Sequence, residues 1–146
     1  PSMFMQLERP RYLAGMALFA AQAGEKEKAQ KLMDEARAFA EERQMRYLYP
    51  LIEMSAGRIL VHAGDQSQAV DAFGRAAEKA DGMGMRPIGW QARAYAARSL
   101  DALGEGAAAA DQREAAQAIV AAIAADFSDG DLAAAFRSHA NAELGR

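Results

Sequence analysis

Apolar residues recur every three or four positions along most of the chain, a spacing that places them on one face of an α-helix. Two segments show the pattern most clearly, at Ala29, Met33, Ala36 and Ala40 and at Ala69, Phe73, Ala76 and Ala80. The 146 residues include 37 alanines, only eight valines and isoleucines together, and no threonine. Strands favour the β-branched residues that are scarce here. The pattern therefore predicts amphipathic helices that each bury one stripe, and it excludes a protein built on β-sheet.

The chain carries an internal repeat with a period of 40 residues. Gly24, Gly64 and Gly104 are spaced by 40, and an acidic residue follows each of them directly. Alanines stand five and twelve positions after every one of these glycines, at Ala29, Ala69, Ala109, Ala36, Ala76 and Ala116. A fixed period of this length is typical of a solenoid built from stacked supersecondary units.

Each period divides into two helices joined by a tight turn. The first helices are expected over about 10–23, 50–63 and 87–103, because their opening prolines, Pro10, Pro50 and Pro87, suit a first helical turn. The repeat glycines suit the left-handed position that ends such a helix. Second helices of about 17–20 residues are expected after each glycine, and Asp65 with Gln68 resembles a capping pair at one of their starts.

The small residues indicate how the hairpins pack. Where two helices cross closely, only a methyl-sized side chain fits, while a larger neighbour such as Phe73 fills the groove one turn away. Beyond the third hairpin, Ser128 opens a helix-start pattern, S-x-x-D. A final helix is expected over about 128–144, with Leu132 and Phe136 on its inner face. This helix would shield the apolar face of the last repeat from water.

The predicted fold is all-α: a right-handed α-solenoid of three antiparallel helix hairpins, of period 40, plus a C-terminal capping helix. The repeats span about 10–46, 47–86 and 87–126, and together with the cap they form one domain over 1–146. We expect this domain to be a fragment of a longer chain.

The charge balance argues against the most common electrostatic partners. The formal net charge is −3, whereas proteins that bind nucleic acid or anionic membranes usually carry a basic excess. The longest purely apolar stretch, 118–125, is too short to cross a bilayer. The absence of cysteine excludes disulfides and thiolate zinc sites and fits a reducing compartment. We therefore expect a cytoplasmic chain that binds neither nucleic acid nor membrane directly.

One stretch resembles a known repeat family. The run Gly64-Asp65-x-x-x-Ala69-x-x-x-Phe73-x-x-Ala76 is similar to the tetratricopeptide repeat, whose pattern has a turn glycine followed by alanine, an aromatic residue and alanine. Gly57 stands where that pattern has a small residue on the first helix, with Ala17 and Ala97 as its counterparts. The period is longer than the family's period of about 34 residues, and Arg113 replaces the aromatic residue in the third repeat. The resemblance covers about 10–126 and implies a helical module that binds proteins.

The longer period is similar to the extended repeats toward the C-terminus of large bacterial signalling ATPases, which include LuxR-type transcriptional activators and adenylate-cyclase-like regulators. This resemblance rests on Gly84-Met85-Arg86-Pro87-x-x-Trp90 and, in the final helix, on Asp129, Leu132 and Phe136. Ala133 stands where that group has arginine. The resemblance implies a regulatory module within a bacterial signalling or transcription-regulating protein, and the 13 arginines against four lysines also suggest a GC-rich bacterial gene.

No pattern of catalytic or metal-binding residues is found. His62 and His139 lie on different predicted helices and lack the spacing that puts two metal ligands on one face. Gly82-Met83-Gly84 lacks the Lys-Ser/Thr of a phosphate-binding loop, and no serine has a G-x-S-x-G context. Trp90 is expected to pack between hairpins. We therefore expect no enzyme activity, no metal and no cofactor.

The first helices of a stacked array line its concave face, which suits a groove for a peptide or a partner helix. Arg58 and Arg98 occupy equivalent points 40 residues apart on this face. The predicted partner-binding residues are Arg11, Met54, Arg58, Gln91 and Arg98. The arginines would form a ladder that binds carboxylates of an acidic peptide or protein, with Met54 and Gln91 as the floor beside them. The competing interpretation is an ordinary surface pair of Arg98 with Asp101.

Two other functions stay open from the sequence. The chain can be a structural segment of a longer solenoid without a separate ligand, and its N-terminal hairpin, which lacks a cover, can then pair with a second copy as a homodimer. A small-molecule pocket that regulates an attached ATPase or DNA-binding domain would also fit the resemblance, but no residues of the sequence locate it.

Overall fold

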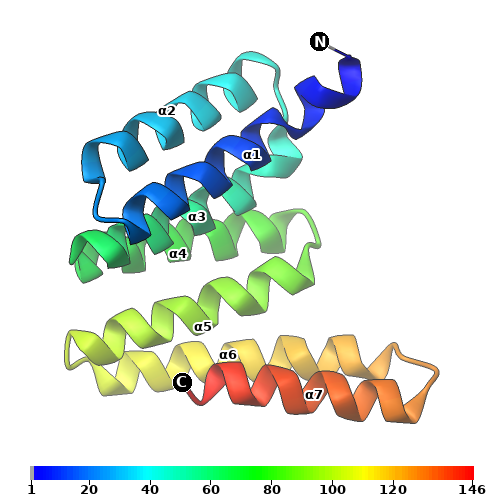
Figure 1. Ribbon diagram of the computed structural model, residues 1–146. Helices are drawn as coiled ribbons and strands as arrows, with labels where there is room; N and C mark the ends of the chain where they lie inside the picture. The colour runs from blue at the N-terminus through cyan, green and yellow to red at the C-terminus, as the bar shows by residue number, and fades with distance from the viewer. Residues whose placement is uncertain (1) are drawn as a thin grey trace.

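The computed structural model describes residues 2–146, which form seven α-helices and one short 3-10 helix, with no strand among them. In chain order these are α1 (Met3–Gln22), α2 (Lys26–Glu42), η1 (Arg46–Leu48), α3 (Tyr49–Ala63), α4 (Gln66–Gly82), α5 (Arg86–Ala102), α6 (Gly106–Ala125) and α7 (Gly130–Leu144). The hairpins α1–α2, α3–α4 and α5–α6 are stacked in chain order, with α7 at the end opposite the N-terminus (Figure 1). The predicted all-α fold of three stacked hairpins and a final helix is confirmed.

The repeat glycines end or follow the first helices as predicted. Gly24, Gly64 and Gly104 have φ angles of +80°, +85° and +80°, in the left-handed region that a Cβ disfavours. The backbone N–H of the acidic residue after each glycine donates to the carbonyl oxygen five residues earlier, at 2.9 Å in all three turns. This hydrogen bond satisfies a carbonyl that the helix leaves unpaired. Local sequence therefore determines the turn within each hairpin.

Two of the three predicted helix starts are confirmed. Pro50 and Pro87 lie in the first turns of α3 and α5. Pro10 instead lies inside α1, which begins at Met3 after a Ser2 cap, so the prediction that Pro10 begins a helix is wrong. An interior proline removes one backbone hydrogen bond. The Pro10 ring is completely buried, and its packing offsets that loss.

Small side chains set the distance between the helices. The repeat alanines are completely buried: Ala29, Ala36, Ala69, Ala76, Ala109 and Ala116. The large side chains of Met33 and Phe73 are also buried among them. Gly57 of α3 approaches the Phe73 ring of α4 so closely that an added Cβ would lie 2.5 Å from a ring carbon. Its counterparts Ala17 and Ala97 are buried as well, so the same contact recurs along the stack.

The final helix covers the end of the stack with a different face from the one predicted. The Asp129 carboxylate, rather than Ser128, accepts hydrogen bonds from the first backbone N–H groups of α7. Leu132 is 57% exposed, so its predicted place on the inner face is wrong. The buried residues of α7 are Ala133, Ala140 and Leu144, with Phe136 partly buried beside them. Leu132 lies about 100° around the helix from Ala133 and therefore faces solvent.

Two arginines fix the last turn of α7. Arg98 of α5 donates to the carbonyl oxygen of Glu143 at 2.7 Å, and Arg113 of α6 donates to that of Leu144 at 3.0 Å. The last carbonyl oxygens of a helix have no partner within the helix. Arg113 stands where the second repeat has Phe73, and it also pairs with Asp101. The departure of the third repeat from the pattern therefore provides an anchor for α7.

Candidate partner-binding site

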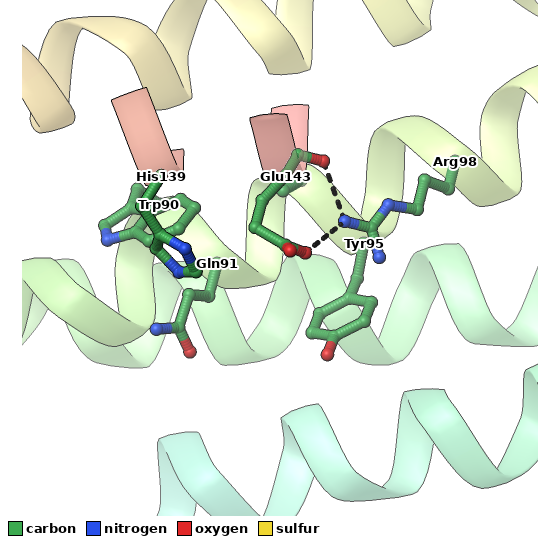
Figure 2. Close-up of a pocket in the computed structure, with 7 residues that line it drawn as sticks. Trp90, Gln91, Tyr95, Arg98, His139 and Glu143 are labelled. Carbon is green, nitrogen blue, oxygen red and sulfur yellow. Dashed lines mark hydrogen bonds and ion pairs between the residues drawn. The ribbon is translucent and has the colours of Figure 1, made fainter. Parts of the chain in front are cut away.

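A hollow of about 190 Å³ lies between α5 and α7. It is lined by Trp90, Gln91, Ala94, Tyr95 and Arg98 of α5 and by His139 and Glu143 of α7. In Figure 2, Arg98 reaches toward Glu143, whereas Gln91 and Tyr95 point away from α7. We call this hollow the α5–α7 site.

Arg98 is held by α7. One guanidinium nitrogen donates to the Glu143 carbonyl oxygen at 2.7 Å and to its carboxylate at 3.0 Å. The other Glu143 carboxylate oxygen lies 3.1 Å from the guanidinium of Arg146. The predicted surface pair of Arg98 with Asp101 is wrong, because Arg113 takes Asp101 and α7 lies within reach of Arg98. The Nε of Arg98 is buried without a hydrogen-bond partner.

Tyr95 links the two predicted arginines. The guanidinium carbons of Arg58 and Arg98 lie 5.3 and 5.0 Å from the centroid of its ring, within the range of cation–π attraction. Phe73 stacks on the same ring, with 5.3 Å between the centroids and 17° between the planes. The core therefore orients Tyr95, and Tyr95 in turn holds positive charges from two consecutive hairpins at one place.

The other predicted binding residues are placed differently. Gln91 lines the α5–α7 site. Met54 is buried in the core beside Phe73 instead of on the floor of a groove, because complete burial of an apolar side chain is more favourable than partial burial. Arg11 is exposed on α1 at the register position of Gln91, which is two helical turns from the register position of Arg58. The structure thus brings Arg58 and Arg98 together and leaves Arg11 and Met54 outside the site.

Three residues of the site were not among those predicted: Tyr95, His139 and Glu143. Tyr95 stands three residues before Arg98, a spacing that makes two side chains neighbours on a helix, so the sequence did contain a signal for it. His139 and Glu143 belong to α7, which lies outside the three 40-residue periods. The repeat pattern therefore contains no information about where they dock.

Comparison of the chain with protein-family models, with curated proteins and with solved structures found no match. Within residues 2–146, no three His, Cys, Asp or Glu side chains are grouped so that they could hold a metal ion. No helix in that range combines the length and the apolar character needed to cross a membrane. The function must therefore be argued from the chemistry of the site itself.

The α5–α7 site and Arg58 beside it offer groups suited to recognition. Arginine presents a planar fork of N–H donors that matches a carboxylate. The Trp90 and Tyr95 rings offer apolar surface, and the Gln91 amide can both donate and accept hydrogen bonds. Glu143 already places a carboxylate on Arg98. The chain itself therefore contains an example of the ligand chemistry that Arg98 accepts.

Proposed function

We propose that this chain is a non-catalytic interaction or regulatory module that binds an acidic peptide, a partner protein or a neighbouring domain at Arg58, Tyr95 and Arg98. The proposal rests on one observation: two guanidiniums from consecutive hairpins meet at one aromatic ring beside a hollow. Rigid helices hold the two charges at a fixed separation, so two carboxylates of a partner can bind with little ordering of the protein.

Arg58 is the main anchor in this proposal. Its guanidinium contacts the Tyr95 ring and makes no ion pair within residues 2–146, whereas Arg98 is paired with Glu143. The pair of Arg98 with Glu143 is partly exposed, and such pairs contribute under about 1 kcal/mol. A partner carboxylate therefore binds Arg58 directly and competes with Glu143 for Arg98.

The wider setting of the proposal follows from the resemblance to tetratricopeptide repeats of bacterial LuxR-type and adenylate-cyclase-like regulators. A module of that kind acts within a cytoplasmic signalling or transcription-regulating protein and needs no cofactor of its own. The solenoid-like stack of hairpins supports this setting, because stacked helical hairpins present an extended surface to a partner.

The experiment uses Trp90, the single tryptophan of the chain, which lines the α5–α7 site. The chain is titrated with peptides that carry two glutamates at varied spacing and with the same peptides carrying glutamine. We expect Trp90 emission to change and saturate with the acidic peptides alone. Arg58→Glu should weaken binding at least about tenfold, since it removes a charge-assisted contact, and Glu143→Gln should strengthen it by releasing Arg98.

Arg46→Glu is the matched control, because Arg46 is exposed on η1 and the substitution changes the charge equally. The melting temperatures of all variants are compared so that loss of binding is not confused with unfolding. Equal weakening by Arg46→Glu and Arg58→Glu would mean that peptides respond to net charge alone, and the proposed site would be rejected.

A second candidate function is a structural or self-associating segment of a longer solenoid with no separate ligand. The large apolar side chains that α1 exposes at the N-terminal end of the stack favour it. Under this function no acidic peptide changes Trp90 emission, and Arg98 serves only to hold α7.

A further inference from the structure

α1 exposes an apolar stripe. Met5, Tyr12, Met16 and Phe19 are separated by seven, four and three residues, so they share one face of the helix. The exposed fractions are 66% for Met5, 67% for Tyr12, 38% for Met16 and 70% for Phe19. Large apolar side chains gathered on one exposed face are typical of an interaction surface. We call these four residues the N-terminal stripe.

The 40-residue register shows what this face does in the other hairpins. Tyr12 corresponds to Ile52 and Ala92, Met16 to Ala56 and Ala96, Phe19 to Ile59 and Ser99, and Met5 to Met45 and Met85. Ile52 and Ile59 of α3 pack into the core that contains α1 and α2. Ala92 and Ala96 of α5 pack into the core that contains α3 and α4. At both junctions the preceding hairpin covers this face, and the N-terminal stripe is the same face of the first hairpin.

A hollow beside the stripe leads to the same conclusion independently. The hollow between α1 and α2 has a volume of about 460 Å³, and the register-equivalent hollow between α3 and α4 has about 130 Å³. Their equivalent lining residues are Arg9 and Tyr49, Tyr12 and Ile52, and Phe39 and Lys79. Arg37 and Glu41 of the preceding helix α2 form part of the wall of the smaller hollow. The larger hollow therefore has the shape that a preceding second helix would narrow.

The two junctions also agree on a charge in the covering helix. Glu41 of α2 lines the hollow beside Tyr49. Asp81 of α4, 40 residues on, lies beside Gly89, where an added Cβ would be 3.3 Å from its carboxylate. Arg9 is the counterpart of Tyr49 and Gly89 in α1. An acidic residue at the same place of a further hairpin would therefore lie beside the Arg9 cation, which favours the contact.

The opposite end of the stack does not provide a helix of this kind. There α7 lies over the last hairpin with Ala133, Ala140 and Leu144 turned inward. Exposed residues of α7 include Arg137 and Asn141. The C-terminal end of a second copy thus presents the polar side of α7 and not an alanine-faced second helix, so a head-to-tail pair of chains does not reproduce the junction.

We propose that the N-terminal stripe is an inter-repeat junction whose occupant is a further helical hairpin of the same type, placed ahead of α1 in the polypeptide. The second helix of this hairpin presents alanines at spacings of three and four residues, as α2 and α4 do, and an acidic residue near its C-terminal end. The argument is continuity with the two junctions already in the structure. The inference deepens the second candidate function and does not depend on peptide binding at Arg58 and Arg98.

The test joins a copy of residues 47–86 directly ahead of Leu7, the residue that follows such a hairpin in register. Residues 7–146 without the added hairpin serve as the reference. If the hairpin docks, the α1 amides become protected from hydrogen exchange by at least about tenfold, and the midpoint of thermal unfolding rises. Phe19→Glu should remove both gains in the fused chain and change the reference little, because Phe19 is exposed when nothing covers it.

Gln22→Glu is the control substitution, at an exposed position of α1 outside the stripe. A fused chain whose α1 amides exchange as fast as those of the reference overturns the proposal. It is also overturned if the 146-residue chain sediments as a dimer at a concentration on the order of 100 μM and Phe19→Glu makes it monomeric, because the occupant is then a second copy. Titration of the fused chain with acidic peptides reports separately on Arg58 and Arg98.

Discussion

Single positions decide how closely the helices approach one another. The repeat alanines expose no surface, and at Gly57 the Phe73 ring takes the space that even a methyl group would need. Ala17 and Ala97 hold the equivalent positions of the other two hairpins. Protein interiors are packed so densely that a change of one methylene is felt. These small residues therefore connect the sequence directly to the distance between helices.

Gly57→Ala is expected to destabilise the protein by about 1–3 kcal/mol, although alanine favours a helix over glycine. The new Cβ would meet three carbons of the Phe73 ring at 2.5 to 2.9 Å, and this ring is completely buried. Gly74→Ala is the control on the exposed side of α4, where no atom lies within 4 Å of an added Cβ. It should stabilise the protein by about 0.5–1 kcal/mol. Denaturant unfolding measures both values, and equal effects would contradict the close approach of α3 to α4.

Among the elements, α7 depends most on its neighbours. A helix of 15 residues is marginal on its own in water, and the buried residues of α7 include two alanines that contribute little apolar area. Its last carbonyl oxygens are bound by Arg98 and Arg113, from two different helices. The position of α7 is therefore determined by contacts with α5 and α6 and not by its own periodicity.

Two leucines of α7 provide a matched pair of substitutions. Leu144→Ala should lower the free energy of unfolding by about 2 kcal/mol, since Leu144 is buried against the core that contains Trp90. Leu132→Ala should change it by less than about 0.5 kcal/mol, because Leu132 is largely exposed. Chemical denaturation of both variants tests the assignment of the inner face. A larger loss at Leu132 would restore the face predicted from the sequence.

The molecule as a whole has unlike ends. At one end α7 covers α5 and α6, and Phe136 meets the Trp90 ring edge to face with 6.3 Å between the centroids. At the other end α1 leaves Tyr12 and Phe19 exposed. Repeat arrays need a polar surface at their ends to stay soluble. The C-terminal end has such a surface, and the N-terminal end has the form of a junction.

Removal of residues 128–146 should lower both the melting temperature and the solubility, because it uncovers the apolar face of the last hairpin. Trp90 is 3% exposed in the complete chain, so its emission should shift to longer wavelength when α7 is absent. A truncated chain that keeps its melting temperature, its emission maximum and its monomeric state would show that α7 is no cap.

Much of the fold could be predicted from local chemistry. The glycine–acid turns, the helices that start at Pro50 and Pro87, and the buried repeat alanines follow from neighbouring residues, and the structure confirms them. Pro10 was misplaced because the same proline fits a first turn or a buried interior position. The candidate site was predictable only in part: the register brings Arg58 and Arg98 together, but it contains no information about Glu143.

By itself, the sequence determined the helices, their turns and the 40-residue register, because each depends on backbone conformation and side-chain spacing within a few residues. Only the tertiary structure decided that Arg98 binds Glu143, that Met54 enters the core and that Leu132 faces solvent. These outcomes depend on which surfaces meet when the hairpins and α7 pack. Burial and pairing of that kind involve residues up to 45 positions apart, so local patterns do not encode them.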